Sequence, residues 1–238
     1  MEHDIVVHLW VDIACPWCWI AKKRLERGIA LSEQRVAVEY HAYQIDPNSP
    51  QEPTLSYLES LCQLTGTTPE KLLPQLDILV DAGHNEGIDI RWEQVVNVNT
   101  SLAHQLVYAA KARGTTPEQA ALLGAQSVEL LFQARFTHGT DLTQISHLSD
   151  IAAHLGLSAE EIHTELANNT YANMVHRDMR EAQLLGITEV PFSIIGGKFG
   201  VCGAQPPEVF AKTIRHALDE MTVATAQEIP LEKGNTPS

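Results

Sequence analysis

The segment IVVHLWVDIACPWC occupies residues 5–18. Its first ten residues are almost continuously apolar and rich in β-branched side chains, which is typical of a strand covered on both faces by helices. Two cysteines separated by Pro16 and Trp17 follow at once. Pro16 suits the first turn of a helix, because its missing N–H needs no partner there. The segment therefore predicts a buried strand that leads directly into a helix beginning at the cysteines.

A second strand is expected at residues 36–45, which read VAVEYHAYQI. Strand, helix and strand in succession form a βαβ unit, for which a right-handed crossover is expected. The turn-rich segment DPNSPQEP at 46–53 then interrupts the pattern. Beyond it the hydrophobic residues recur with a period of 3.6. Helices are predicted near 54–65, 69–82, 99–113, 117–137, 144–155, 158–167 and 170–185.

The strand pattern returns after Gly186. VPFSII at 190–195 and KFGVC at 198–202 flank Gly196-Gly197, a two-residue hairpin signal. A last helix is expected from Gln205 to about residue 220. The chain thus reads as two parts of one sheet separated by a long helical block.

Composition excludes several classes of protein. The 30 acidic and 16 basic residues give a net charge of −14, which opposes binding to nucleic acid or to an anionic membrane surface. No run of 18 apolar residues exists, so no transmembrane helix is expected. The acidic start Met-Glu-His-Asp does not resemble a secretory signal. We therefore expect a cytoplasmic protein, where thiols are normally kept reduced.

The pair Cys15 and Cys18 carries the chemistry of this sequence. A C-x-x-C motif that follows a strand and opens a helix within a βαβ unit is a thioredoxin-like redox signature. The N–H groups and dipole at a helix N-terminus favour a thiolate, and Cys15 lies nearest to them. Cys18 lies one turn further in. We therefore expect Cys15 to attack a disulfide and Cys18 to resolve the mixed disulfide that forms.

A metal site is the alternative role for these cysteines. Structural zinc needs four ligands, usually with a second pair of cysteines or histidines at close spacing. The other two cysteines, Cys62 and Cys202, are isolated, and no histidine pair accompanies them. We therefore expect no metal and no organic cofactor. The redox-active disulfide itself would suffice, with a low-molecular-weight thiol as cosubstrate.

Four motifs of this chain together resemble the DsbA-like thioredoxin superfamily, and within it the FrnE-like branch of dithiol–disulfide oxidoreductases. The motifs are DIACPWC at 12–18, NT at 99–100 with AH at 103–104, LFQA at 131–134 with Gly139, and GITEVPF at 186–192 with GVCGAQP at 200–206. Without the resemblance, Asn99 and His104 would be expected only to cap and pack helices.

The resemblance implies an α/β thioredoxin-like fold, βαβ plus ββα around a mixed sheet, with a large helical insertion. Residues 1–50 and 186–221 would form the thioredoxin-like domain, 51–185 the insertion and 222–238 a flexible tail. Cys15 and Cys18 would be catalytic. Pro191 would be a cis-proline, and Pro16, Trp17, Val190 and Pro191 would contact the substrate. Partners would be a disulfide-containing protein or small molecule and a thiol reductant or oxidant, with the chain a monomer or homodimer.

Two other functions remain open on the sequence. Glutathione-dependent isomerases and kappa-class transferases resemble this architecture, but they generally have serine at the first cysteine position. A redox-switched chaperone or binding module would use Trp10, Trp17 and Trp19 as an apolar contact surface, although packing in the core is the simpler expectation.

Four further residues have expected roles. Cys62 is expected in the core, and Cys202 is expected either as a small buried residue or as a third thiol near the site. Asp12 and Glu39 are candidates to accept the proton of Cys18, because each is predicted in a buried strand.

Overall fold

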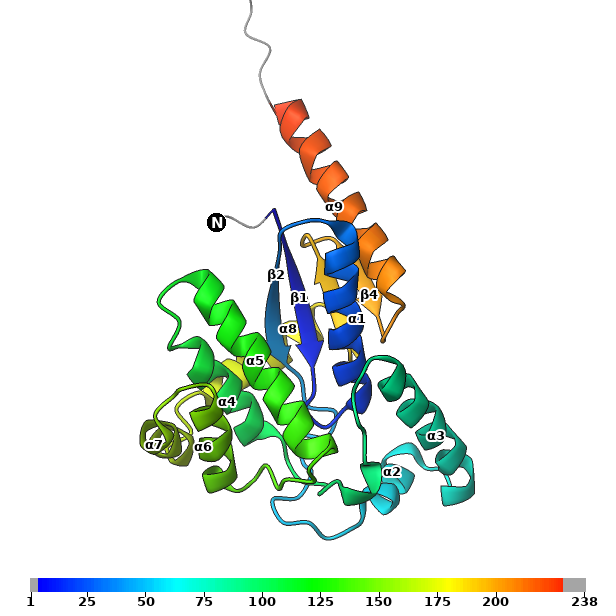
Figure 1. Cartoon of the computed structure of the whole chain (residues 1–238), viewed down its shortest axis with the longest axis vertical. Helices are drawn as coiled ribbons and strands as arrows, with labels where there is room; N and C mark the ends of the chain where they lie inside the picture. Colours follow the sequence, from blue (N-terminus) through cyan, green and yellow to red (C-terminus); the bar gives the residue numbers. More distant parts are fainter. Residues whose placement is uncertain (1–3, 229–238) are drawn as a thin grey trace, which may run out of the picture.

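The strand β1 (Ile5–Val11) lies inside a mixed four-stranded sheet of order β2-β1-β3-β4. The computed structural model describes residues 4–228. β2 (Val36–Ala42) runs parallel to β1, and β3 (Phe192–Ile195) runs antiparallel to it on the other side. β4 (Phe199–Cys202) completes the sheet as the second strand of the predicted Gly196-Gly197 hairpin. The predicted α/β fold with a mixed sheet is confirmed, and the sheet unites segments about 150 residues apart in the chain (Figure 1).

Helices cover both faces of the sheet (Figure 1). α1 (Pro16–Ser32) and α9 (Pro207–Glu228) pack against each other on one face. A Cβ at Gly28 of α1 would lie 2.6 Å from Phe210 Cβ and 2.7 Å from the Pro207 carbonyl oxygen, so this close approach requires glycine. α8 (Ala172–Leu184) lies on the opposite face, where the indole N–H of Trp10 donates to the Asp178 carbonyl oxygen at 3.4 Å.

The block between β2 and β3 is helical, as the 3.6-residue period predicts. It contains α2 (Tyr57–Thr65), α3 (Pro69–Asn85), a short 3-10 turn η1 (Trp92–Gln94), α4 (Ser101–Lys111), α5 (Pro117–Phe136), α6 (Ile145–His154), α7 (Ala159–Ala167) and α8. α2 and α3 lie beside the end of the sheet where α1 begins, and α4 to α7 form a cluster on the other side (Figure 1). The helical block thus surrounds the N-terminus of α1.

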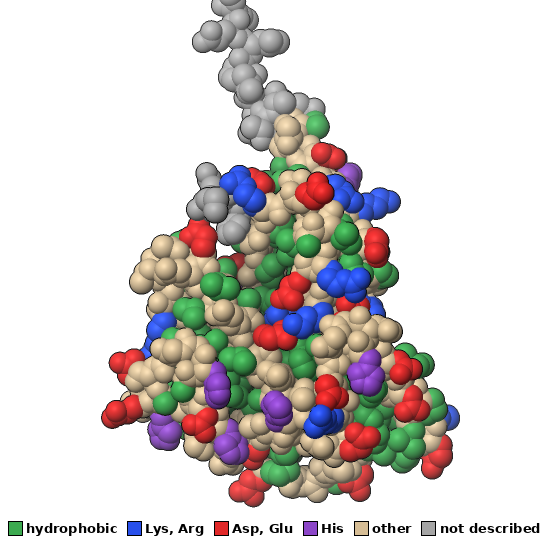
Figure 2. Space-filling view, viewed as in Figure 1, with side chains coloured by type: hydrophobic (Ala, Val, Ile, Leu, Met, Phe, Trp, Pro, Cys, Tyr) green, Lys and Arg blue, Asp and Glu red, His purple; other side chains and the backbone are tan. Residues whose placement is uncertain are grey.

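A large hydrophobic cluster joins the sheet to this helical block. It includes Ile5 of β1, Leu106 of α4, Phe132 of α5 and Phe210 of α9. Figure 2 shows hydrophobic side chains at the surface around α3, while acidic side chains mark the lower edge of the molecule. Within residues 4–228, no helix combines the length and the apolar character needed to cross a bilayer.

The expected tail is shorter than predicted, because α9 continues to Glu228. Residues 222–228 are therefore helical rather than a flexible tail, and residues 229–238 lie outside the described part of the chain. The sequence MTVATAQE at 221–228 contains neither glycine nor proline, so nothing in it ends the helix. The predicted end of this helix near residue 220 is wrong, because residues 221–228 form a helix without a clear amphipathic period.

Candidate active site

Cys15 occupies the N-cap of α1, and Pro16 is the first helical residue. The backbone N–H of Cys15 donates to the Asp12 carbonyl oxygen at 2.9 Å, and that of Cys18 donates to the Cys15 carbonyl oxygen at 3.0 Å. No side chain caps this helix, and its first turn holds no acidic residue. The positive end of the helix dipole therefore faces Cys15 without a competing carboxylate in that turn.

The two thiols differ in exposure. Cys15 keeps 7% of its surface accessible, whereas Cys18 is 0% exposed, and both are free thiols. Burial raises the pKa of the Cys18 thiol well above its usual range, helped by the hydrogen bond and charge of Cys15 and by the charge of Asp12. A backbone contact at Asp12 acts in the opposite direction. Cys18 is thus held as a neutral thiol behind the more accessible Cys15.

The peptide bond between Val190 and Pro191 is cis, as expected. It lies opposite Cys15, whose Sγ is 3.8 Å from the Val190 carbonyl oxygen. The backbone N–H of Gly203, just after β4, donates to the Pro191 carbonyl oxygen at 2.8 Å. The two chain segments that the sequence singled out, at 15–18 and at 190–191, therefore meet at one place.

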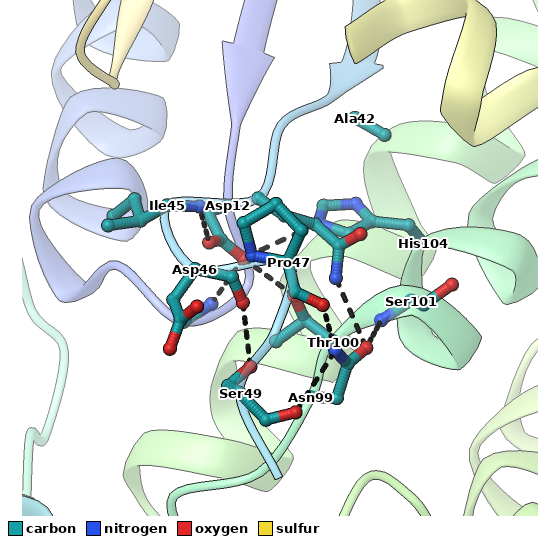
Figure 3. Close-up of polar contacts among 12 residues, drawn as sticks. Asp12, Ala42, Ile45, Asp46, Pro47, Ser49, Asn99, Thr100, Ser101 and His104 are labelled. Atoms are coloured by element: carbon teal, nitrogen blue, oxygen red, sulfur yellow. Dashed lines mark hydrogen bonds and ion pairs between the residues drawn. The ribbon is translucent and has the colours of Figure 1, made fainter. Parts of the chain in front are cut away.

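Asp12 joins this site to the helical block (Figure 3). Its buried carboxylate accepts hydrogen bonds from the backbone N–H of Ala14 at 2.9 Å, the N–H of Ile45 at 2.7 Å and the Thr100 hydroxyl at 2.9 Å. His104 Nε2 lies 3.4 Å from the same carboxylate. Burial by itself would raise the pKa of Asp12, but the contacts with His104 and with the two N–H groups outweigh it and lower the pKa. Asp12 is therefore a buried carboxylate anion that holds three chain segments together.

A cavity of about 620 Å³ opens beside Cys15. Cys15, Pro16 and Trp17 form one side, and α2 and α3 form another. The loop that follows β2 and the segment before α4 complete it. This volume falls in the range of small-molecule sites, and Cys15 is one of the residues that line the cavity.

A family model described as "DSBA-like thioredoxin domain" matches residues 6–215. The chain belongs to the DsbA-like thioredoxin family. A probable DsbA oxidoreductase from Streptomyces coelicolor is 29% identical, with a TM-score of 0.82, and the match covers 98% of this chain and 95% of that one.

Two more distant structures share the fold of this DsbA-like protein. A 2-hydroxychromene-2-carboxylate isomerase is 16% identical, with a TM-score of 0.64, over 94% of this chain and 100% of that one. The cytosolic disulfide reductase DsbM from Pseudomonas aeruginosa with GSH is 13% identical, with a TM-score of 0.58, over 93% and 99%.

Asn99 has a larger role in this DsbA-like protein than the capping and packing expected from sequence. Its side-chain amide donates to the carbonyl oxygens of Pro47 at 2.9 Å and Ser49 at 3.3 Å. Its Oδ1 accepts from the Gln44 amide at 3.1 Å and from the Ser101 backbone N–H at 2.9 Å. Asn99 thus holds the loop that borders the cavity (Figure 3). Only the family motif around residues 99–104 points to this role, since Gln44, Pro47 and Ser49 are about 50 residues away in the chain.

Two expectations are wrong: the role of Glu39 as a proton acceptor, and the place of Trp10 and Trp19 in an apolar contact surface. Glu39 is half-buried on β2 and forms an ion pair with Lys111 at 2.9 Å, and it is not among the groups that shift the Cys18 pKa. Trp10 and Trp19 are buried in the core, so of the three tryptophans only Trp17, 36% exposed, offers a contact surface. The pattern of β1 and α1 turns the other two inward.

The remaining cysteines differ in outcome. Cys62 is half-buried on α2 rather than a core residue. Cys202 is exposed and so is not a small buried residue; it fits the other expectation, a third thiol near the site, and its thiol donates to Glu189 Oε1 at 2.9 Å. That hydrogen bond, with smaller contributions from burial and the charge of Glu189, raises the pKa of Cys202. Cys202 therefore stays a weakly nucleophilic thiol beside the 189–191 loop.

A histidine–carboxylate network crosses the sheet to α8. His8 Nδ1 lies 3.0 Å from His41 Nε2, and His41 Nδ1 lies 3.3 Å from Asp178 Oδ1. Asp178 also accepts hydrogen bonds from the Tyr108 hydroxyl and the Ala42 backbone N–H. Together with Glu181, His41 and Asp178 form the one group within residues 4–228 whose ligand atoms lie close enough to hold a metal ion. None of these residues lines the cavity at Cys15.

The network predicts a stability that depends on pH. Burial lowers the pKa of His8 below 6.5, helped by the charges of His41 and Lys111, while Glu39 and Glu181 oppose the shift. As pH falls through 6.5, the unfolded chain therefore binds a proton at His8 before the folded protein does, and the free energy of unfolding decreases. Urea unfolding at a series of pH values between about 7.5 and 5 measures this loss.

The matched variants are His8→Gln and, at an exposed histidine on α6, His154→Gln. His8→Gln is expected to flatten the pH dependence, whereas His154→Gln is expected to leave the slope unchanged. Equal slopes in the two variants would contradict the assignment to His8.

Proposed function

We propose that this DsbA-like protein is a thiol–disulfide oxidoreductase or isomerase of the FrnE-like branch, active in the cytoplasm on protein or small-molecule disulfides. The observation that carries the proposal is the pairing of Cys15, 7% exposed at the N-cap of α1 and lining the cavity, with a fully buried, protonated Cys18 one turn behind it. The nucleophile must be reachable by the substrate and ionised, whereas the resolving thiol must stay protonated until the mixed disulfide has formed.

The reductive reaction consists of two exchanges. The Cys15 thiolate attacks one sulfur of the substrate disulfide, the substrate S–S bond breaks, and the leaving thiolate takes up a proton from solvent. Cys18 then gives its proton to solvent and attacks Cys15 Sγ. The bond between Cys15 and the substrate breaks, and the second substrate thiolate leaves and takes up a proton from solvent. Two electrons have passed to the substrate, and a Cys15–Cys18 disulfide remains. Two molecules of a low-molecular-weight thiol reduce it again and become one disulfide.

The other predicted site residues have positioning roles in this proposal. Pro16 and Trp17 border the cavity beside Cys15, and Trp17 remains partly exposed for contact with substrate. Val190 and Pro191 face Cys15, so that a substrate chain bound along their backbone has its sulfur near Cys15 Sγ. We propose no metal in this reaction, because two cysteines supply both the nucleophile and the electrons.

The proposal is tested by equilibrium in thiol–disulfide buffers. Purified protein is equilibrated with mixtures of oxidised and reduced glutathione or dithiothreitol, its free thiols are alkylated, and the modified cysteines are identified by mass spectrometry. Cys15 and Cys18 are expected to be oxidised together, at a potential between about −270 and −120 mV, while Cys62 and Cys202 remain alkylated. Failure of Cys15 and Cys18 to form a disulfide with each other would refute the proposal.

A further inference from the structure

We propose that the cavity beside Cys15 selects small, largely apolar thiols and disulfides that carry no negative charge, and discriminates against those bearing carboxylates. This inference rests on the proposed disulfide exchange and specifies its substrate class. Three properties of the cavity carry it: its apolar wall, the large apolar side chains at its exposed rim and the sign of its charges.

Leucines contribute a large part of the apolar wall of the cavity. Leu72, Leu76 and Leu79 of α3 are buried and line it, and Leu61 of α2 lines it as well, beside polar residues such as Ser60 of α2. At about 620 Å³ the cavity has room for a small molecule. Apolar groups that enter it and contact these leucines would be removed from water, which favours binding.

The exposed rim of the same cavity combines polar residues, among them Thr54, Gln63 and Gln75, with three large apolar side chains. Trp17, Ile45 and Leu64 line it, yet they remain 36%, 42% and 55% exposed. They come from α1, from the loop after β2 and from α2, and so three separate segments present large apolar side chains around one opening. A clustered apolar surface around a cavity marks a binding site for an apolar partner.

The charges around the cavity are negative. Among the described residues that line it, none is lysine, arginine or histidine, and the two charged ones are Asp12 and Asp46. Arg135 lies behind the wall, fully buried, and donates to the Val96 carbonyl oxygen and Asn97 Oδ1 instead of facing the cavity. Its charge is offset by Asp12, which is held as a carboxylate.

A carboxylate that entered this cavity would therefore lose water without meeting a cationic side chain. The N–H groups at the start of α1 provide the remaining positive potential, and the proposed mechanism uses them for the Cys15 thiolate. The net charge of −14 adds a further repulsion at long range. Neutral ligands meet neither penalty, and amine-bearing ligands avoid the repulsion.

Reduction of a small disulfide uses the same two thiol–disulfide exchanges as the proposed function. Cys15 Sγ forms a bond to one half of the small disulfide, and the other half leaves as a thiol after taking a proton. Cys18 then gives its proton to solvent and displaces the bound half, which leaves as a thiolate and takes up a proton. One disulfide thus gives two thiols, and Cys15 and Cys18 are oxidised to a disulfide. Dithiothreitol supplies the two electrons for the next turnover in the assay.

The test compares two disulfides that share one skeleton and differ in two negative charges and two small ester methyl groups. N,N′-diacetylcystine carries two carboxylates, and its dimethyl ester carries none. The kcat/KM for each is measured with dithiothreitol as reductant and divided by the rate constant of its uncatalysed reaction with dithiothreitol, which removes differences in intrinsic reactivity. The ester is expected to be preferred by about tenfold or more, since one poorly compensated charge in this setting is worth at least that factor.

Two substitutions test whether the preference for the ester arises at the cavity. Leu64→Lys brings a cation to the rim and is expected to reduce the ester preference severalfold. Leu184→Lys makes the same change on α8, at a leucine that is 87% exposed and does not line the cavity, and is expected to leave the preference unchanged. Circular dichroism and thermal unfolding verify that both variants fold.

The outcomes separate this inference from the proposed function. Equal or better turnover of the diacid, or an ester preference that is identical in Leu64→Lys and Leu184→Lys, would overturn the substrate class. Reduction of the protein disulfides of insulin without reduction of the ester would also overturn it, while leaving the oxidoreductase intact. Lack of turnover of every disulfide would refute the proposed function itself.

Discussion

The Cys15→Ser variant is expected to reduce disulfides no faster than the buffer does. A serine hydroxyl at the N-cap of α1 is neither ionised near neutral pH nor able to form a disulfide, so the first exchange is lost completely. The measurement is the rate of insulin or low-molecular-weight disulfide reduction in the presence of dithiothreitol. Retention of the wild-type rate would show that Cys15 is not the nucleophile.

Cys18→Ser is the matched control for this result. It removes the same atom type one turn further into α1 but leaves the accessible thiol of Cys15 in place. Cys18→Ser is expected to complete the first exchange and to accumulate a mixed disulfide at Cys15, visible as an added mass that reductant removes. Cys15→Ser should show no such adduct.

The same pair of variants bears on the alternative functions. Full catalytic activity on a glutathione-dependent isomerisation after loss of Cys18 would favour the isomerase reading over the dithiol mechanism. Suppression of aggregation that survives the loss of both cysteines would favour a chaperone or binding module. In the proposed function neither activity is expected.

Asp12→Ala is expected to lower the free energy of unfolding by about 3 to 5 kcal/mol. The substitution removes a buried carboxylate and leaves the Ala14 and Ile45 N–H groups, the Thr100 hydroxyl and His104 without their shared acceptor. Urea unfolding of the reduced protein measures the loss. Because the pKa of Asp12 is lowered in the folded state, its stabilisation is present above pH 3.8 and decreases as pH falls through the folded-state value.

Asp46→Ala is the control for the Asp12 variant. Asp46 lines the same cavity, but it is exposed, and its carboxylate accepts the Asn48 backbone N–H at 3.0 Å. An exposed group of this kind is expected to change the free energy of unfolding by about 0.5 kcal/mol. A loss of stability in Asp12→Ala no larger than in Asp46→Ala would refute the role of Asp12 in holding the site together.

The local sequence was sufficient to predict those elements whose conformation is determined by neighbouring residues. The apolar run before Cys15, the proline at the first helical position and the Gly196-Gly197 turn predict β1, α1 and the hairpin, and all three are present. The 3.6-residue period likewise predicts the helices of the central block. The boundary of α9 was wrong because a helix without a stop signal ends where packing and solvent decide, and local pattern contains neither.

Some features of the site follow from the local sequence, and others follow only from the tertiary structure. The spacing of Cys15 and Cys18 on a helix determined by itself that one thiol lies at the N-terminus and the other a turn inside, since helix geometry is local. Tertiary structure alone decided the partners of Asp12, the ion pair of Glu39, the exposure of Cys202 and the cavity between α1, α2 and α3. Each of these depends on contacts between residues more than ten positions apart, where burial and the competition for hydrogen-bond partners are settled only when the chain packs.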